Sequence, residues 1–308
     1  KKVKQMQIFD IPINSKRMET TRIGTFDFPL AVHKNDLKKN VLGFVNWHWH
    51  YEFQLTYVVR GTISVFFNQQ TIDLHEGQGI YINPEVLHMI RDRYDSDAMF
   101  ISLDVSPKLL TSFPNSVFER SYVKPVFCSS AADAVILDPG VFWQKKILDE
   151  AMSIEQDYKS RSFGWELAVS SSLYAIWKEL VCHLHESLAE HDAPAADGAR
   201  MRRNQRIKEI LSYIREHFTE KITLDEIAKH LHLSTNECCR LFKKNMNCTL
   251  FEYITEYRLS KSMELLEHTD LPVSQIAYES GFGSSSYFIE KFRKNVGMTP
   301  AAFRKARR

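Results

Sequence analysis

The sequence predicts a mixed fold, with an N-terminal antiparallel β-barrel, helices that follow it, and a C-terminal all-α domain that contains two helix-turn-helix units. Three observations support this prediction. Between residues 43 and 105, short runs rich in Val, Ile, Phe, Tyr and Thr are separated by Gly, Asn-Gln and Pro signals, with no helical stretch between them. From residue 139 onward, apolar residues recur at steps of three and four, which is the period of a helix. Nearer the C-terminus, one helical pattern occurs twice, at an offset of 49–50 positions.

Length, charge and cysteine content narrow the classes of protein that the chain can represent. Its 308 residues suit about two domains, and the sequence has no run of 18 apolar residues that would predict a membrane-spanning helix. The five cysteines are scattered and lack metal-ligand spacing, so we expect a reducing, cytoplasmic location. From Arg200 onward there are 20 Lys and Arg against 13 Asp and Glu, a net +7, whereas the earlier residues hold 20 against 25, a net −5. The basic C-terminal third is therefore the candidate for a polyanionic partner, although a solvated basic surface would have the same composition.

The barrel is expected to occupy residues 1–135. The first 40 residues are mixed in character, with short strands expected near 23–28. The expected barrel strands lie in the runs VNWHWHYEFQLTYVVRG, TISVFFN, TIDL, GIYINP and AMFISLDV. A further extended segment, SYVKPVFCSS, is expected to end the domain.

Two helices are expected in residues 136–190. Ile147, Ala151 and Ile154 mark the first, and the second runs from about Trp165 to Leu188. Helices of this length after a barrel either pack on it or pair between subunits. We expect them to form the dimerisation region of a homodimer.

Residues 191–205 are expected to be a flexible linker. The segment is poor in apolar residues and contains Pro194 and Gly198. A basic cluster lies at its end and consists of Arg200, Arg202, Arg203 and Arg206.

Residues 206–308 are expected to form the all-α domain, because a two-helix pattern occurs there twice. Ile227-Ala228 matches Ile276-Ala277, and Phe242-Lys243-Lys244 matches Phe292-Arg293-Lys294. In each copy a short helix, a turn and a second helix follow one another, as in a helix-turn-helix, whose second helix lies in the major groove of DNA. A single copy would also suit an ordinary helical hairpin, whereas two copies in register favour the DNA-binding interpretation.

The beginnings of these helices carry N-terminal signals. Thr223, Ser234 and Thr249 each stand three residues before a glutamate, and this arrangement predicts capping boxes. Between the two copies, Thr249 to His268 predicts a helix of 20 residues, about 30 Å long. That length is close to one DNA turn of roughly 34 Å, so one chain is expected to read two adjacent major grooves.

From Ile207 to Arg304 the chain resembles the AraC/XylS family of bacterial transcription regulators. The resemblance rests on IAKHLHLSTNECCRLFKK, on FEYITEYRLSKSMELL with Pro272-Val273 after it, and on IAYESGFGSSSYFIEKFRKNVGMTPAAFRK. It implies two helix-turn-helix units that bind tandem major grooves of double-stranded DNA in a promoter region. It also implies an activator, for which RNA polymerase would be a further partner.

Carried over position by position, the resemblance places the DNA-binding residues on the second helix of each unit. These residues are Thr235, Asn236, Cys239, Arg240, Lys243, Lys244, Ser284, Ser285, Ser286, Glu290, Arg293 and Lys294. Arg240 is expected to contact a base, because a guanidinium can bind guanine with two hydrogen bonds. Lys243, Lys244 and Lys294 are expected to contact phosphates, which adds affinity without sequence information. Glu290 would repel phosphate or accept only from cytosine, so the second helix is expected to read weakly.

The barrel segment contains two spacings that are similar to the two cupin motifs. The first is Gly43-x4-His48-x-His50-x3-Gln54-x6-Gly61, and the second is Gly79-x4-Pro84-x3-His88. Because side chains alternate along a strand, His48, His50 and Gln54 share one face and can converge with His88 inside a cupin-like barrel. The expected effector-binding residues are His48, His50, Gln54, Tyr57, Tyr81, Asn83 and His88.

Three interpretations of the histidines remain open. Three imidazoles suit a divalent metal, yet Gln54 stands where metal-binding cupins have a glutamate ligand. Metal at His48, His50 and His88 is therefore the least favoured interpretation, and no cofactor is expected. A polar effector pocket and purely structural histidines are favoured equally over it. The family resemblance suggests a sugar or a related hydroxylated metabolite as the effector.

Three functions compete on this basis. The first is a transcription regulator whose barrel binds a small-molecule effector. The second is a metal-dependent cupin enzyme fused to a DNA-binding domain, and the third is an effector-independent DNA-binding dimer. The sequence contains no paired acid–base carboxylates, nucleophile elbow or phosphate loop that would support catalysis, so we expect a regulator and no enzyme.

Overall fold

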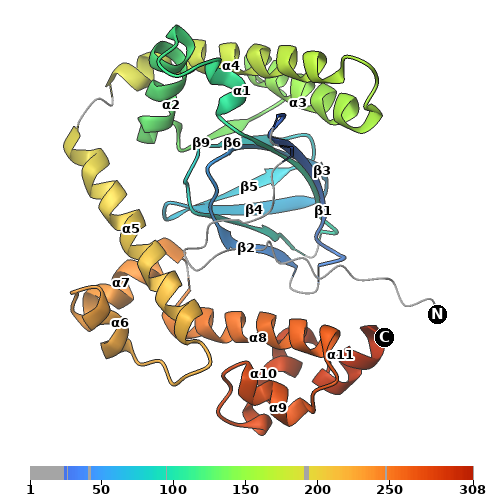
Figure 1. The fold of residues 1–308 in the computed structure, drawn as a ribbon, viewed down its shortest axis with the longest axis vertical. Helices are drawn as coiled ribbons and strands as arrows, with labels where there is room; N and C mark the ends of the chain where they lie inside the picture. Colours follow the sequence, from blue (N-terminus) through green and yellow to red (C-terminus); the bar gives the residue numbers. More distant parts are fainter. Residues whose placement is uncertain are drawn as a thin grey trace.

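Two facing antiparallel sheets form the N-terminal domain of the computed structural model, which describes residues 24–25, 27–40, 43–94, 96–190, 194–246 and 248–307 (Figure 1). One sheet has the order β1 (Leu30–Asp36), β8 (Met99–Val105), β3 (Phe53–Arg60), β6 (Gly79–Ile82) and β9 (Ala134–Leu137). The other has the order β2 (Phe44–His48), β7 (His88–Asp92), β4 (Thr62–Phe67) and β5 (Gln70–His75). The predicted cupin-like barrel is confirmed. The strands expected near 23–28 lie partly outside the described residues, and the first described strand begins at Leu30.

Alternation along the strands divides their side chains between the barrel interior and an outer layer. Val58 belongs to the interior cluster between the sheets, whereas its strand neighbours Leu55 and Tyr57 belong to a second cluster with Leu148 and Trp177. The helices of that second cluster are α3 (Phe142–Ser160) and α4 (Trp165–Glu190), which lie over the outer side of the five-stranded sheet (Figure 1). The two helices expected in residues 136–190 therefore pack on the barrel.

The prediction of an extended segment at SYVKPVFCSS is wrong. The chain there forms a π-helix (Phe118–Val123), α2 (Lys124–Cys128) and the start of a 3₁₀-helix (Ser130–Ala132), and a further short helix, α1 (Lys108–Thr111), precedes them. Val123 and Val126 are fully buried in the cluster under α4, and this packing decides the local structure over the β-branched composition.

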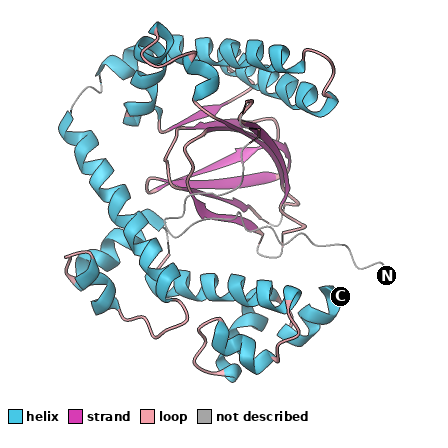
Figure 2. Ribbon diagram, viewed as in Figure 1, coloured by secondary structure: helices cyan, strands magenta, loops and turns pink. Residues whose placement is uncertain are grey.

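A long helix, α5 (Pro194–His217), joins the barrel domain to the C-terminal domain (Figures 1 and 2). Residues 194–205, expected to belong to a flexible linker, form its first half, and residues 191–193 lie outside the described residues. Pro194 occupies the first helical position, where its missing N–H costs no hydrogen bond. None of the helices in the described part of the chain is long and apolar enough to cross a membrane.

Two helix-turn-helix units follow, as the repeat predicts. The first consists of α6 (Leu224–His230) and α7 (Thr235–Met246), and the second of α9 (Val273–Glu279) and α10 (Ser285–Val296). Between them runs α8 (Leu250–His268), and α11 (Pro300–Arg307) ends the described chain. Capping boxes at Thr223 and Thr249 are present, and Ser234 exchanges the same two hydrogen bonds with Glu237.

The turn of the second unit packs against the segment between α5 and α6. Gly281 has a φ of +81°, and a Cβ there would lie 2.0 Å from the carbonyl oxygen of Phe218, so this close approach requires glycine. Arg258 of α8 donates to the carbonyl oxygens of Phe218 and Glu220 at 2.8 and 2.6 Å. These contacts tie α8 and the turn of the second unit to the segment that leads into the first unit.

Candidate DNA-binding surface and barrel site

The exposed face of α7 carries the residues predicted to read DNA in the first unit. Asn236, Cys239, Arg240 and Lys243 are exposed and Thr235 is half-buried. The opposite face is apolar, and its Cys238 and Phe242 are fully buried in the core of the unit. This division follows the helical period, so the predicted residues share one face.

In the second unit, the predicted DNA-binding residues of α10 differ in their exposure and in their hydrogen bonding. Ser284 is the N-cap, and its side chain accepts a hydrogen bond from the backbone N–H of Tyr287, while Ser285 is half-buried. Ser286 is exposed, as are the three charged residues Glu290, Arg293 and Lys294. Two exposed apolar side chains on this helix, Tyr287 and Ile289, were missed by the sequence reasoning. The neighbouring Phe288 fills the core position of this turn.

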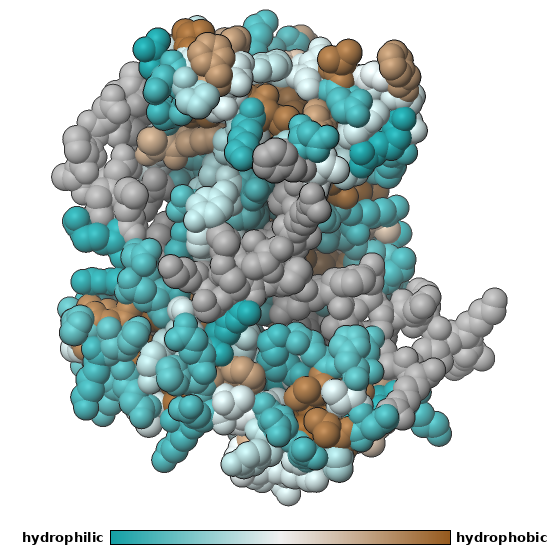
Figure 3. Space-filling model, in the orientation of Figure 1, coloured by the Kyte–Doolittle hydropathy of each residue, from teal (hydrophilic) through white to brown (hydrophobic). Residues whose placement is uncertain are grey.

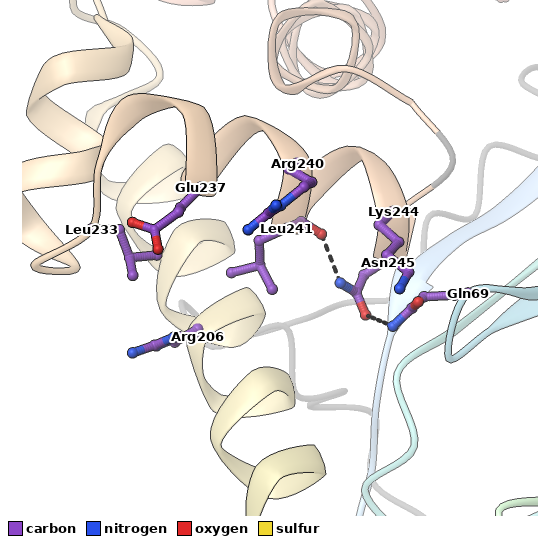
Figure 4. A pocket seen from close by; sticks show the side chains of 8 residues that line it. All are labelled: Gln69, Arg206, Leu233, Glu237, Arg240, Leu241, Lys244 and Asn245. Atoms are coloured by element: carbon purple, nitrogen blue, oxygen red, sulfur yellow. Dashed lines mark hydrogen bonds between the residues drawn. The ribbon is translucent and has the colours of Figure 1, made fainter.

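A groove of about 320 Å³ runs along one side of α7, between that helix, α5 and the barrel (Figure 4). Its cationic side chains come from two helices: Arg206 of α5, and Arg240 and Lys244 of α7. Gln69, in the turn between β4 and β5, donates from Nε2 to Oδ1 of Asn245 at 3.2 Å (Figure 4). The barrel therefore touches the C-terminal part of the predicted DNA-reading helix.

A shared apolar cluster extends this contact. It consists of outward-facing barrel residues together with the core of the first unit, and its barrel members are Phe44, Trp47, Trp49, Leu87 and Met89. Lys208 of α5 lies across the same boundary, with Nζ 3.5 Å from the ring centroid of Trp49 and 3.4 Å from Oε2 of Glu85. Sequence alternation identified the outward face of the tryptophans but gave no signal for what covers it.

Inside the barrel, the structure brings His48, His50 and His88 together. All three are buried, and their candidate ligand nitrogens lie within 4.8 Å of one another. Ring centroids are 4.2 Å apart for His48 and His88, 5.3 Å for His50 and His88, and 5.6 Å for His48 and His50. Burial and the neighbouring His50 lower the pKa of His88 to about 3, so its imidazole is neutral at ordinary pH.

Gln54 is buried, and its amide is held by Asp104, because Nε2 donates to Oδ1 at 2.9 Å. The structure does not bring Tyr57, Tyr81 and Asn83, which were expected in the effector site, together with the histidines. Tyr57 donates to Glu155 of α3, and the Tyr81 hydroxyl donates to Oδ1 of Asn83 at 2.7 Å.

The physical reason for this correction is strand alternation. Asn83 in turn donates to the carbonyl oxygen of Val126 at 3.0 Å, and Tyr81 packs with Phe53 and Trp177 in the cluster under α4. Tyr57 and Tyr81 thus face the outer helices, on the opposite side of the sheet from the barrel interior. They stabilise the packing of sheet on helices and do not join the histidines.

Comparison with known proteins agrees with both halves of this architecture. Residues 227–306 match the model of a helix-turn-helix domain, and residues 40–139 match that of an AraC-like ligand-binding domain. An HTH-type transcriptional regulator of Bacillus subtilis, YdeC, is 35% identical over 300 residues, which is 97% of this chain and 99% of that protein. The chain belongs to the AraC family of transcriptional regulators.

Two further matches to this AraC-family regulator have lower sequence identity. The melibiose operon regulatory protein of Escherichia coli K12 is 22% identical over 260 residues, 84% of this chain and 83% of that protein. The DNA-binding domain of AdpA, solved in complex with a target DNA, is 26% identical and covers 32% of this chain and 90% of its own, with a TM-score of 0.32. The relatives matched over most of the chain are regulators, which confirms the prediction of a DNA-binding regulator and not an enzyme.

Proposed function

We propose that this AraC-family regulator inserts α7 and α10 into successive major grooves of promoter DNA, under the control of a small molecule bound in its barrel. One observation carries the proposal: two helix-turn-helix units, each with an exposed polar and basic face, lie at the two ends of α8. Its 19 residues span about 29 Å, close to the roughly 34 Å of one DNA turn. The contacts of Gly281 and Arg258 support a fixed separation of the two units.

Selection of binding sites from random duplexes by the full chain tests this proposal. We expect the enriched sequences to contain two blocks about one helical turn apart, with the stronger sequence preference in the block read by α7. Enrichment of a single block would contradict tandem reading, and no enrichment would contradict sequence-specific binding.

The barrel contact supports control of DNA binding by a ligand. Gln69, Trp49 and Glu85 of the barrel touch Asn245 and Lys208 of the DNA-binding domain. A ligand that shifts β2 or β7 acts on strands whose outward side chains pack on the first unit. It can therefore favour one arrangement of the domains over another, provided that it binds the two arrangements with different affinity.

A sugar or a related hydroxylated metabolite is our proposed class of effector, and an activator that contacts RNA polymerase is our proposed mode of action. The relationship to the melibiose operon regulatory protein supports the first assignment, and the family resemblance of the DNA-binding domain underlies the second. A thermal-shift screen of the full chain against sugars tests the first, because a saturating ligand raises the melting temperature of the state it binds. If no compound in the screen raised the melting temperature, the effector-independent dimer would be favoured. Reduced transcription on addition of the protein to a purified transcription system would contradict an activator.

We further propose that a homodimer forms through the helices outside the five-stranded sheet. Phe142 is 76% exposed at the start of α3, Leu167 is 77% exposed near the start of α4, and Phe163, in the loop that joins the two helices, is fully exposed. Apolar side chains gather over these upper helices (Figure 3). Patches of this kind on a soluble surface are typical of contacts between proteins.

Leu167→Arg tests the dimer. A charge on this face has no partner in a tight contact, so we expect sedimentation velocity to give a dimer for the wild-type chain and a monomer for the variant. Lys178→Arg, a charge-conserving change at an exposed position of the same helix, is the control and should leave the dimer intact. A wild-type chain that sediments as a monomer at high micromolar concentration would contradict the proposal.

A further inference from the structure

The three buried histidines of the barrel are brought together by different parts of the chain. His48 ends β2, His50 follows it after one residue, and His88 begins the neighbouring strand β7. His48 and His88 are directly paired across the two strands. The cluster is thus built on adjacent strands of one sheet, which fixes its members relative to one another.

Hydrogen bonds to the backbone determine the tautomer of each ring. The Nδ1 atoms of His48, His50 and His88 lie 2.8, 2.9 and 2.9 Å from the carbonyl oxygens of Asn46, Glu52 and Val86. Because a carbonyl oxygen can only accept, each Nδ1 carries the proton and each Nε2 is the nitrogen that bears the lone pair. An Nδ1–H bonded to a backbone carbonyl is the arrangement that orients metal-bound histidines in proteins.

We propose that Nε2 atoms of His48, His50 and His88 hold one divalent first-row transition metal ion. The Nε2 atoms of His50 and His88 are buried, and within the described part of the chain no side chain or backbone group forms a hydrogen bond with either. A buried polar atom without a partner loses the hydrogen bonds it would make in water, and this loss occurs here at two neighbouring rings. A cation between the rings would give these atoms a partner, because one ligand nitrogen of each histidine lies within 4.8 Å of those of the other two.

Metal binding is expected to shorten the distances between the three ligand nitrogens. With metal–nitrogen bonds of about 2.0–2.1 Å in tetrahedral geometry, ligand nitrogens stand roughly 3.4 Å apart. The nitrogens here lie within 4.8 Å of one another, and we expect binding to bring the three rings, and with them the ends of β2 and β7, to the shorter spacing. Three protein ligands also leave a coordination position for water or for an oxygen of a hydroxylated metabolite.

Metal binding was the least favoured of the three interpretations of these histidines that the sequence left open. Gln54 lowered the expectation of a metal because it replaces a glutamate ligand, yet three neutral imidazoles with a bound water are a complete ligand set for zinc. The amide of Gln54 is oriented by Asp104 and is not needed as a fourth ligand.

The strand ends that would move are also those that touch the DNA-binding domain. Trp47 and Trp49 alternate with His48 and His50, while Leu87 and Met89 flank His88, and all four apolar side chains belong to the cluster shared with the first helix-turn-helix unit. Metal binding is therefore expected to alter the contact with that unit. This coupling rests on the proposed function, whereas the metal site itself does not.

Direct metal binding by the full chain is the first test. After treatment with a chelator, the protein is dialysed against Zn²⁺ or Co²⁺, and bound metal is measured by mass spectrometry. We expect one ion per chain, absorption bands of nitrogen-coordinated Co²⁺, and a higher melting temperature with metal. Fewer than about 0.2 ions per folded chain at micromolar free metal would overturn the site.

Histidine variants locate the ion. His50→Gln and His88→Gln are expected to weaken metal binding by more than about 100-fold, since loss of an outer hydrogen-bond partner alone costs about 10–100-fold. His75→Gln, at an exposed histidine of the same domain, should bind like the wild type. Circular dichroism establishes that each variant is folded. Undiminished binding by folded His50→Gln and His88→Gln would overturn the assignment.

Titration with the selected duplex distinguishes metal binding itself from the effect of the bound metal on DNA affinity. We expect Zn²⁺ to change the DNA affinity of the wild type at least about fivefold and that of His50→Gln by less than twofold. DNA binding without stoichiometric metal binding would refute the metal site alone. Stoichiometric metal without sequence-specific DNA binding would refute the proposed function alone, and an unchanged affinity with metal bound would refute the coupling.

Discussion

Phe292→Ala is expected to lower the free energy of unfolding of the C-terminal domain by about 3–5 kcal/mol. Phe292 is fully buried at the centre of the second helix-turn-helix unit, where its ring contacts those of Phe288 and Phe303 edge-on, with centroids 5.5 Å apart in both pairs. Truncation to alanine removes these contacts and leaves a cavity in a small core. Urea denaturation followed by circular dichroism measures the loss.

Its effect on DNA should be local, because the first unit has a separate core around Phe242. We expect the variant to lose protection of the groove read by α10 and to keep that read by α7. Ile289→Ala, at a partly exposed apolar position on the same helix, is the matched control and should change stability by no more than about 0.5 kcal/mol. A loss below 1 kcal/mol for Phe292→Ala would contradict the importance of this core.

Arg240→Ala is expected to weaken binding to the selected duplex by about 1–3 kcal/mol, roughly 5- to 150-fold, and to relax the preference at one base pair. Arg240 is exposed on α7 beside Asn236 and Lys243, and a bidentate contact with guanine would be lost. Titration of duplexes substituted at each position, followed by fluorescence anisotropy, measures both changes.

Lys244→Ala provides the comparison, since a phosphate contact carries no sequence information. It should weaken binding to all duplexes equally and reduce the salt dependence by about one counterion. A uniform loss for Arg240→Ala would instead assign Arg240 to the phosphates.

Much of the DNA-binding domain could be predicted from the sequence, because its signals are local. The repeat of Ile227-Ala228 at Ile276-Ala277 and the capping glutamates at positions 226, 237 and 252 act within one or two turns of helix. The residues of the shared DNA-facing surface follow from the helical period once the core positions are known.

Other features depend on contacts distant in sequence and were therefore missed. For Tyr81 on β6, alternation does not say which face lies inside the barrel. Tyr57 stands three residues after Gln54 on β3, so alternation places it opposite Gln54, and its assignment to the effector site went against that local signal. The docking of Trp49 on Lys208 joins two domains that the sequence treats separately. The backbone bond of His88 Nδ1, which decides the chemistry of the cluster, follows from local geometry that residue type does not reveal.

Hydroxyl-radical footprinting of the full chain on the selected duplex decides whether α7 and α10 read adjacent major grooves, because it maps each groove that the protein covers. Two protected regions on one side of the duplex, about one helical turn apart, are the predicted result, with the region assigned to α10 absent in Phe292→Ala. Protection of a single groove by the wild-type chain would contradict tandem reading by the two units.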